Sequence, residues 1–189
     1  MARTPSNMLP LGTPAPDFAL PDTNDKVVSL ADFQEGSLLV VAFICNHCPF
    51  VKHIRSQLAS LGEEYMAKGV AFVAINSNDI EAYPDDNMDN MKKEVVEAGY
   101  RFPYLLDESQ AVAQAYDAAC TPDFYLFDGD RKLIYRGQLD ASRPGNEIPV
   151  TGEDLRAAMD AALSGRPVSE EQTPSVGCNI KWKPGNAPD

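Results

Sequence analysis

The stretch Leu38-Leu39-Val40-Val41-Ala42-Phe43-Ile44-Cys45-Asn46-His47-Cys48-Pro49 combines a strong strand signal with a cluster of reactive side chains. Its first seven residues are apolar without alternation, which is typical of a central strand buried on both faces. Apolar residues then recur at intervals of three and four from Val51 to Tyr65, which predicts an amphipathic helix that ends before Gly69. A C-x-x-C motif therefore lies where a buried strand meets a helix.

The flanking sequence predicts an α/β fold of strands alternating with helices. Turn residues between apolar segments, and apolar periodicity within them, define the remaining elements. These are a hairpin at 18–30, a strand at 70–75, helices at 87–98, 109–118 and 151–163, and a hairpin at 124–135. Thr151 is the expected N-cap of the last helix. Alternating strands and helices predict a parallel sheet core, to which the late hairpin adds antiparallel strands.

The length of 189 residues suits one domain, which we assign to residues 1–165, beginning with an irregular arm over 1–16. The tail over 166–189 is rich in Pro, Gly and polar residues, a composition that favours disorder. It nevertheless contains Ile180 and the only tryptophan, Trp182. We therefore expect the tail to be partly docked on the domain.

Charge and composition exclude several classes of function. The formal net charge is −12, which argues against nucleic acid and anionic membrane partners, since both require basic surfaces. The apolar run from Leu38 to Ile44 is too short to span a bilayer, and the N-terminus shows no secretory signal. The chain contains four cysteines, too few for a disulfide scaffold. We expect a cytoplasmic protein that needs no cofactor.

The C-x-x-C motif favours redox chemistry. Unpaired N–H groups and the dipole at a helix N-terminus stabilise a thiolate, and His47 would add to this when protonated. Pro49 suits the first helical position, which would make Cys48 the N-cap and leave Cys45 outside the helix. In the alternative register Cys45 opens the helix. The sequence leaves both registers open.

Metal binding is the rival interpretation of this motif, because Cys45, His47, Cys48 and His53 all carry ligand atoms. A four-ligand zinc site normally draws a second pair of ligands from elsewhere in the chain. No histidine follows His53 in the sequence. We therefore prefer a redox pair and expect no resident metal.

A second signal is Cys120-Thr121-Pro122, directly before the predicted strand at 124–127. A C-x-x-C at the start of the first long helix, followed by X-Pro before a late antiparallel hairpin, resembles the thioredoxin superfamily. The resemblance implies a thioredoxin-like fold, a central mixed sheet flanked by helices, here with an N-terminal β-hairpin and an extra helix insertion. It also implies that the bond before Pro122 is cis, and that Thr121 offers backbone groups to the partner.

The first part of the chain is more closely similar to the alkyl hydroperoxide reductase/thiol-specific antioxidant proteins, the peroxiredoxin group. The residues that carry this resemblance are Gly12-Thr13-Pro14-Ala15-Pro16-Asp17-Phe18-Ala19-Leu20, Val28-Ser29-Leu30 and Asp32-Phe33. It covers about residues 11–165. The segment 174–182 resembles the tail of a peroxiredoxin-like branch.

The chain departs from the peroxiredoxin pattern at the positions that activate peroxide. Aligning P-x-x-x-[T/S]-x-x-C on Cys48 places Val41 at the Pro position and Cys45 at the Thr/Ser position. Pro122 replaces the arginine that precedes the corresponding late strand. These departures favour disulfide exchange over efficient peroxide reduction.

The first hypothesis is thus a thiol–disulfide oxidoreductase that works through a mixed disulfide. By the thioredoxin resemblance, Cys45 attacks and Cys48 resolves, while Thr121 and Pro122 form the partner groove. The expected substrates are a protein disulfide, a low-molecular-weight thiol or a peroxide, and an upstream thiol reductant would regenerate the pair.

Two alternatives remain. One is a thiol peroxidase in which Cys48 is the peroxidatic cysteine and Cys45 or Cys178 resolves the sulfenate. The other is a non-enzymatic copper(I) carrier that uses the two soft thiolates. It resembles copper-delivery proteins of thioredoxin fold, which also use a distal histidine that is missing after His53.

Other residues are candidate auxiliaries. His47 would favour a thiolate, Cys178 is either a third redox thiol or a thiol in a docked tail, and Arg136 either lines the cleft or forms an ion pair. Cys120 is more simply a buried structural thiol. The segment 76–79 follows the second strand, at the end of the sheet where α/β sites gather.

Overall fold

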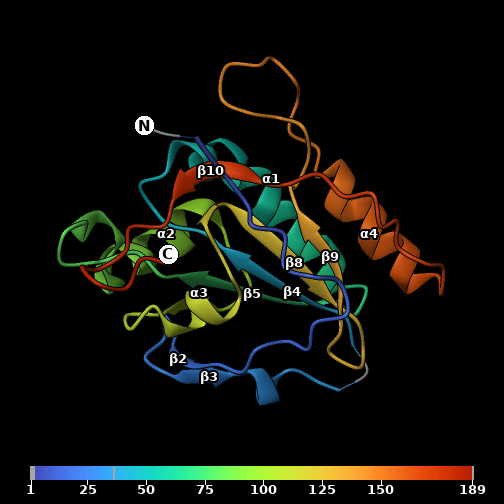
Figure 1. Cartoon of the computed structure of the whole chain (residues 1–189), viewed down its shortest axis with the longest axis horizontal. Helices are drawn as coiled ribbons and strands as arrows, with labels where there is room; N and C mark the ends of the chain where they lie inside the picture. Colours follow the sequence, from blue (N-terminus) through green and yellow to red (C-terminus); the bar gives the residue numbers. More distant parts are fainter. Residues whose placement is uncertain (1–2, 36, 189) are drawn as a thin grey trace.

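The computed structural model describes residues 3–35 and 37–188, and within them the main sheet has five strands in the order β6-β5-β4-β8-β9 (Figure 1). These strands are β4 (Leu39–Phe43), β5 (Ala71–Asn76), β6 (Tyr104–Leu106), β8 (Asp123–Phe127) and β9 (Leu133–Gly137). β4, β5 and β6 are parallel, and β8 and β9 are joined to them by antiparallel pairing. The mixed central sheet predicted from the sequence is confirmed.

Helices cover both faces of this sheet (Figure 1). The core on one face takes side chains from α1 (Pro49–Met66), α2 (Met88–Ala98) and α4 (Glu153–Leu163). The core on the other takes side chains from α3 (Ala111–Ala115) and packs against the hairpin of β2 (Ala19–Pro21) and β3 (Val27–Ser29). Val40 and Ala42 of β4 belong to the first core, and Val41 and Phe43 to the second. Burial on both faces explains why the β4 sequence does not alternate.

Segments near the two ends of the chain pair in a second sheet. β1 (Arg3–Pro5), β10 (Val176–Asn179) and β7 (Cys120–Thr121) form it in the order β1-β10-β7, with antiparallel pairing throughout. The arm over 1–16 was expected to be irregular, and β1 corrects this, since its backbone pairs with a strand of the tail. In the tail, Ile180 is buried and Trp182 packs against the second core.

Three further details differ from the sequence predictions. β6 was not predicted, since three residues are too few to show a period. α3 spans 111–115 rather than 109–118, and it starts after Gln110, whose φ of 67° is left-handed. The N-cap of α4 is Gly152 rather than Thr151, because a φ of 73° at this position suits glycine. Short 3-10 helices occur at Leu30–Asp32 and Pro84–Asp86.

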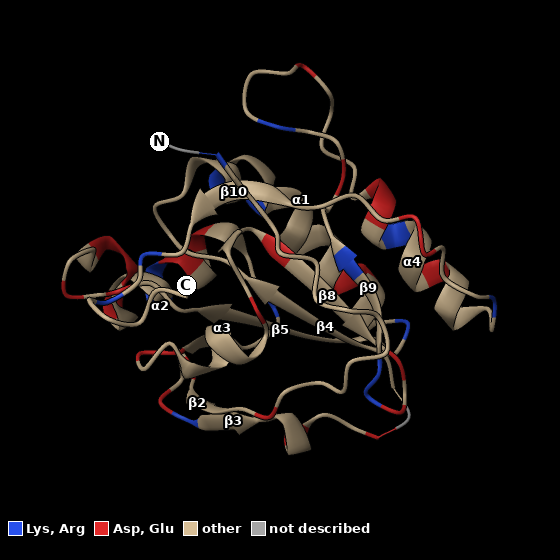
Figure 2. Cartoon of the chain, in the orientation of Figure 1, with Lys and Arg blue, Asp and Glu red and all other residues tan. Residues whose placement is uncertain are grey.

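Charged residues lie mainly on the helices and loops around the sheets. Lys and Arg are spread over several elements among the more numerous acidic residues (Figure 2). Within the described part of the chain, none of the helices has the length and apolar character needed to traverse a bilayer.

Candidate functional site

The C-x-x-C motif connects the end of β4 to the start of α1. Cys48 is the N-cap of α1 and has extended backbone angles, while Pro49 occupies the first turn. The Cys48 carbonyl accepts the first helical hydrogen bond, from the Lys52 N–H, at 2.9 Å. Of the two registers that the sequence left open, the structure therefore has the one in which Cys45 lies outside the helix.

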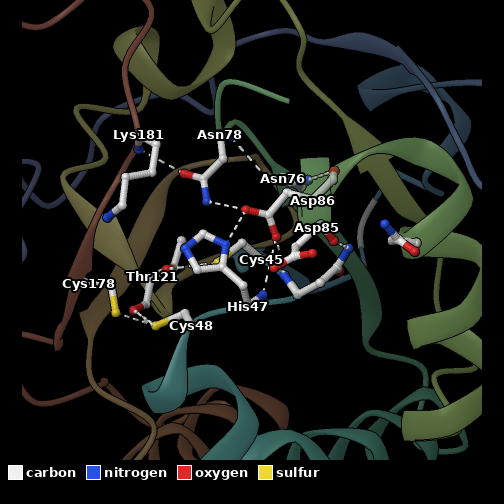
Figure 3. Close-up of polar contacts among 12 residues, drawn as sticks. Cys45, His47, Cys48, Asn76, Asn78, Asp85, Asp86, Thr121, Cys178 and Lys181 are labelled. Carbon is white, nitrogen blue, oxygen red and sulfur yellow. Dashed lines mark hydrogen bonds and ion pairs between the residues drawn. The ribbon is translucent and has the colours of Figure 1, made fainter. Parts of the chain in front are cut away.

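The thiols of this motif face β7 and β10 (Figure 3). The Cys48 sulfur lies 3.4 Å from the Thr121 carbonyl oxygen and 2.8 Å from the Cys178 sulfur. The Cys45 sulfur lies 3.6 Å from the Thr121 hydroxyl oxygen. The Thr121–Pro122 peptide bond is cis. The structure thus brings three cysteines and Thr121 together, each no more than 3% exposed.

The third thiol is placed by strand pairing. Cys178 pairs with Thr121, and Asn179 pairs with Cys120, so β10 runs antiparallel to the short strand before Pro122. Gly177 permits this close approach, because a Cβ at its position would overlap the Thr121 carbonyl oxygen. Any residue larger than glycine would require β10 or β7 to shift.

A buried carboxylate lies beside the motif. Asp86 Oδ2 is 2.5 Å from His47 Nδ1 and accepts a hydrogen bond from Asn78 Nδ2 at 2.8 Å. Asp86 Oδ1 accepts the backbone N–H groups of Asn46 and His47, at 2.8 and 3.2 Å. The His47 ring also stacks on Tyr83, with centroids 5.6 Å apart. Asp86 therefore fixes both the loop between the cysteines and the orientation of the imidazole.

The exposed edge of His47 borders solvent. A hollow of about 500 Å³ is bordered by His47 and by charged residues of both signs. The other charged residues that border it are Lys52, Arg55, Asp85, Lys93, Glu94 and Glu97. The His47 side chain is 18% exposed, whereas that of Asp86 is 0% exposed. The imidazole thus connects the buried carboxylate to the surface.

The pKa values of the three thiols diverge. Hydrogen bonds from Cys45, Cys178 and the Val51 N–H lower the pKa of Cys48 to about 5, although burial opposes the shift. The hydrogen bond to Cys48, burial and the Asp86 charge raise the pKa of Cys45 well above its ordinary value. Burial and the neighbouring Cys48 raise the pKa of Cys178 to about 12. Cys48 is therefore the thiolate at neutral pH.

His47 and Asp86 each favour the charged form of the other. The hydrogen bond to Asp86 raises the pKa of His47, against the effect of burial. Burial alone would raise the pKa of Asp86, but the hydrogen bonds from His47 and Asn78 lower it overall. The Cys48 charge also raises the pKa of His47, so the imidazolium favours the thiolate in return.

Cys45, His47 and Asp86 place a sulfur, a ring nitrogen and a carboxylate oxygen within 4.8 Å of one another. Among the residues that the structure describes, this is a group whose atoms could hold a metal ion. Two of the three ligand atoms, on His47 and Asp86, are already hydrogen-bonded to each other. Their arrangement is accounted for by that bond and by the loop N–H groups that Asp86 accepts.

Three residues that the sequence analysis discussed, Arg136, Cys120 and His53, lie outside the cluster of Cys45, Cys48, Cys178 and Thr121. Arg136 is opposite Tyr125 in β8, whose ring belongs to the core on the face away from α1. The Arg136 guanidinium donates to the Leu9 carbonyl and the Gln172 amide oxygen, so these hydrogen bonds link β9 to the N-terminal arm and the tail and not to the cysteine cluster. Cys120 is buried, and burial raises its pKa. His53 is 2.7 Å from the Ser142 hydroxyl.

Asp86 and Asn78 are site residues that the sequence reasoning did not select. Asp86 lies in a Pro-Asp-Asp segment that, with Asp85 and Asp89, suggests a cation site only weakly, because the spaced pattern of a calcium loop is missing. Asn78 lies in the segment after β5 that was placed at the functional end of the sheet. Its side-chain oxygen also accepts the Lys181 N–H at 2.8 Å, which links the tail to the cluster (Figure 3). Such a contact between distant segments leaves no local pattern.

Comparison with known proteins gives relatives at several distances. A solved structure of an uncharacterized conserved protein from Geobacillus kaustophilus is 62% identical, with a TM-score of 0.96 and 98% of each chain covered. Thiol-disulfide oxidoreductase ResA of Bacillus subtilis (strain 168) is 28% identical over 123 residues, or 65% of this chain. The chain spans 64% of the length of that relative, slightly under two thirds.

The fold has a more distant counterpart. The thioredoxin domain of a thiol-disulfide oxidoreductase from Bacteroides vulgatus is 21% identical, with a TM-score of 0.59 over 69% of this chain and 89% of that one. The architecture is thioredoxin-like, with additional N-terminal strands. Residues 10–155 match the family described as Redoxin. This confirms the predicted relationship to the thioredoxin superfamily and the AhpC/TSA proteins, and the chain belongs to the Redoxin family.

Proposed function

We propose that this protein is a thiol–disulfide oxidoreductase whose attacking thiolate is Cys48. The observation that carries the proposal is the position of the Cys48 sulfur, at the N-cap of α1 and in contact with a second thiol. A thiolate is the reactive form of cysteine, and a pKa of about 5 keeps Cys48 ionised at neutral pH. The positive end of the helix dipole adds to this stabilisation.

This proposal reverses the order of attack implied by the thioredoxin resemblance, in which Cys45 attacks. The reason is electrostatic. The Cys45 sulfur faces the Asp86 carboxylate, which favours its protonated form. The Cys48 sulfur receives hydrogen bonds that favour its charged form.

The proposed reaction uses a disulfide as substrate. The Cys48 thiolate attacks one substrate sulfur, the substrate S–S bond breaks, and the second substrate sulfur leaves as a thiolate. A neighbouring thiol of the protein then completes the exchange, and an upstream thiol reductant restores the reduced site. Thiol-disulfide oxidoreductase ResA, a relative by sequence, supports protein thiols and disulfides as the partner class. We place the protein in the cytoplasm, where such a reductant pool is maintained.

A stoichiometric reaction of the reduced full chain with an aromatic disulfide tests this proposal. Attack releases one coloured aromatic thiolate, and we expect this release to be lost in Cys48→Ser and retained in Cys45→Ser. Cys120→Ser is the matched control, because Cys120 is also buried but lies outside the cluster. Release that persists in Cys48→Ser and disappears in Cys45→Ser would contradict the assignment of the attacking thiolate.

A further inference from the structure

The Cys48 and Cys178 sulfurs are already nearly within bonding distance. They lie 2.8 Å apart, although the two residues are 130 positions apart in the chain. A disulfide bond is about 2.05 Å long, so bond formation would need an approach of about 0.8 Å. Both side chains are no more than 1% exposed, so this contact occurs inside the protein rather than at its surface.

The position of Cys178 is fixed on both sides. β10 is hydrogen-bonded between β1 and β7. Ile180, the first residue after β10, donates its N–H to the Ala119 carbonyl at 3.0 Å. Beyond it, the Lys181 carbonyl accepts hydrogen bonds from the Asp79 N–H and the Gln110 amide, at 2.8 and 2.9 Å. These contacts extend along the tail on both sides of Cys178, so its thiol is held against Cys48 by the fold.

We propose that Cys178 is the resolving thiol of Cys48, so that turnover produces a disulfide between these two residues. This inference rests on the proposed function. In the mixed disulfide, Cys48 is bonded to one substrate sulfur. Cys178 loses its proton to solvent and attacks the Cys48 sulfur, and the substrate sulfur leaves as a thiolate that takes up a proton. The substrate disulfide gains two electrons, and Cys48 and Cys178 together lose two.

The charges around the two candidate resolving thiols favour Cys178 over Cys45. The Lys181 ammonium favours the thiolate of Cys178, whereas the Asp86 carboxylate disfavours the thiolate of Cys45. The Cys48 charge is one cause of the high pKa of Cys178. That charge disappears when Cys48 enters a mixed disulfide, so Cys178 becomes easier to deprotonate at the step where it must attack.

The strand pairing gives β10 a second role in this scheme. The thioredoxin resemblance implies that a partner meets the backbone of Thr121, and in this structure Thr121 is paired with Cys178. The C-terminal strand therefore occupies the edge at which a partner is expected. A partner that displaces β10 removes the resolving thiol, and the return of β10 brings that thiol back to the mixed disulfide.

Disulfide mapping of the full chain tests the proposal. The reduced protein is mixed with one equivalent of the aromatic disulfide, quenched with acid and alkylated, and its peptides are identified by mass spectrometry. We expect a Cys48–Cys178 crosslink in the wild type and in Cys45→Ser. In the double variant Cys45→Ser/Cys178→Ser, the mixed disulfide on Cys48 should persist roughly a hundredfold longer than in Cys45→Ser alone, because attack within the molecule is replaced by attack from solution.

Two controls make the result specific. Cys120→Ser should give the wild-type crosslink, because Cys120 lies in the same sheet but outside the thiol cluster. Gly177→Val keeps every thiol but disfavours the close approach of β10, so it should also prolong the mixed disulfide. The wild-type crosslink needs no variant, so it tests the proposal even if a substitution impairs folding.

The failures are distinguishable. A Cys45–Cys48 crosslink in the wild type, with normal resolution in Cys178→Ser, overturns the role of Cys178 and leaves the proposed function standing. If Cys48 forms no mixed disulfide in any variant, the proposed function is overturned together with the inference.

Discussion

Asp86 binds the imidazole of His47 with one carboxylate oxygen, and with the other it binds the backbone of the same loop. The His47 Nδ1 to Asp86 Oδ2 distance is 2.5 Å, and the His47 N–H donates to Oδ1 at 3.2 Å. One buried carboxylate thus sets both the conformation of the C-x-x-C loop and the charge of its histidine. A hydrogen bond from a protonated donor to a carboxylate is stronger than a neutral one.

Replacing Asp86 should lower the pKa of His47. In Asp86→Asn, the carboxylate that raises this pKa is gone, so we expect the His47 titration to move down to or below its ordinary value near 6.5. Proton NMR of the imidazole signals measures the shift. An unchanged His47 titration in the variant would show that the Asp86 contact is not its cause.

The same pair should make stability depend on pH. The pKa of His47 is higher in the folded than in the unfolded state. Its contribution to the free energy of unfolding is therefore fully present below pH about 6.5 and is lost as pH rises through the folded pKa. Urea unfolding across this range should show the loss in the wild type and a flatter profile in Asp86→Asn. A parallel decline in both proteins would assign the pH dependence to other groups.

Cys48 should titrate far below an ordinary thiol. Its pKa of about 5 predicts that thiolate absorbance in the ultraviolet rises with a midpoint near pH 5. We expect Cys48→Ser to lose this transition and Cys120→Ser to keep it. If Cys45 is instead the thiol of low pKa, the transition will persist in Cys48→Ser and the proposed order of attack will be wrong.

Asp123 should reduce stability at neutral pH. Burial raises the pKa of this carboxyl well above its ordinary value, and the Tyr125 hydroxyl donates to its Oδ2 at 3.1 Å. The pKa of Asp123 is higher in the folded than in the unfolded state. Its contribution to the free energy of unfolding is therefore fully present below pH about 3.9 and is lost as pH rises through the folded pKa. Asp123→Asn is uncharged and nearly the same shape, so we expect it to be more stable than the wild type at pH 7.

Comparison of the unfolding free energy of the two proteins at pH 4 and pH 7 checks the effect of Asp123. The difference should be small at the lower pH and should favour the variant at the higher one. Asp130→Asn, in the turn between β8 and β9, provides a control at an exposed carboxylate. If the variant is less stable than the wild type at both pH values, the main role of Asp123 is to accept hydrogen bonds, and the cost of ionising its buried carboxyl group is not what limits stability at neutral pH.

Hydrogen peroxide should react slowly with this site. Val41, Cys45 and Pro122 occupy the positions at which the peroxiredoxin pattern has its proline, its Thr/Ser and its arginine. We expect Cys48 to be oxidised at a rate close to that of a simple thiolate, measured by loss of alkylatable Cys48 over time. Oxidation faster by several orders of magnitude would instead support the thiol peroxidase alternative.

The parts of the fold that were predicted have local causes. The unbroken apolar run of β4 and the three-to-four spacing in α1 reflect burial within single elements, so the core sheet and the C-x-x-C junction could be recognised. Val176-Gly177-Cys178-Asn179 shows no strand pattern, because its pairing depends on Gly177 fitting against Thr121. Asp86 was missed as a site residue for a similar reason, since its role depends on contacts with residues about 40 positions away.

The burial of the thiols separates chemical reactivity from access. Under the proposed displacement of β10, a substrate reaches the buried Cys48 in those molecules in which β10 has moved away, so the observed rate is the intrinsic rate multiplied by the fraction of open molecules. Because β10 also pairs with β1, this opening equilibrium depends on both termini of the chain. Residues at the two ends of the sequence would thus set how often the site can react, without contacting the reacting sulfur atoms.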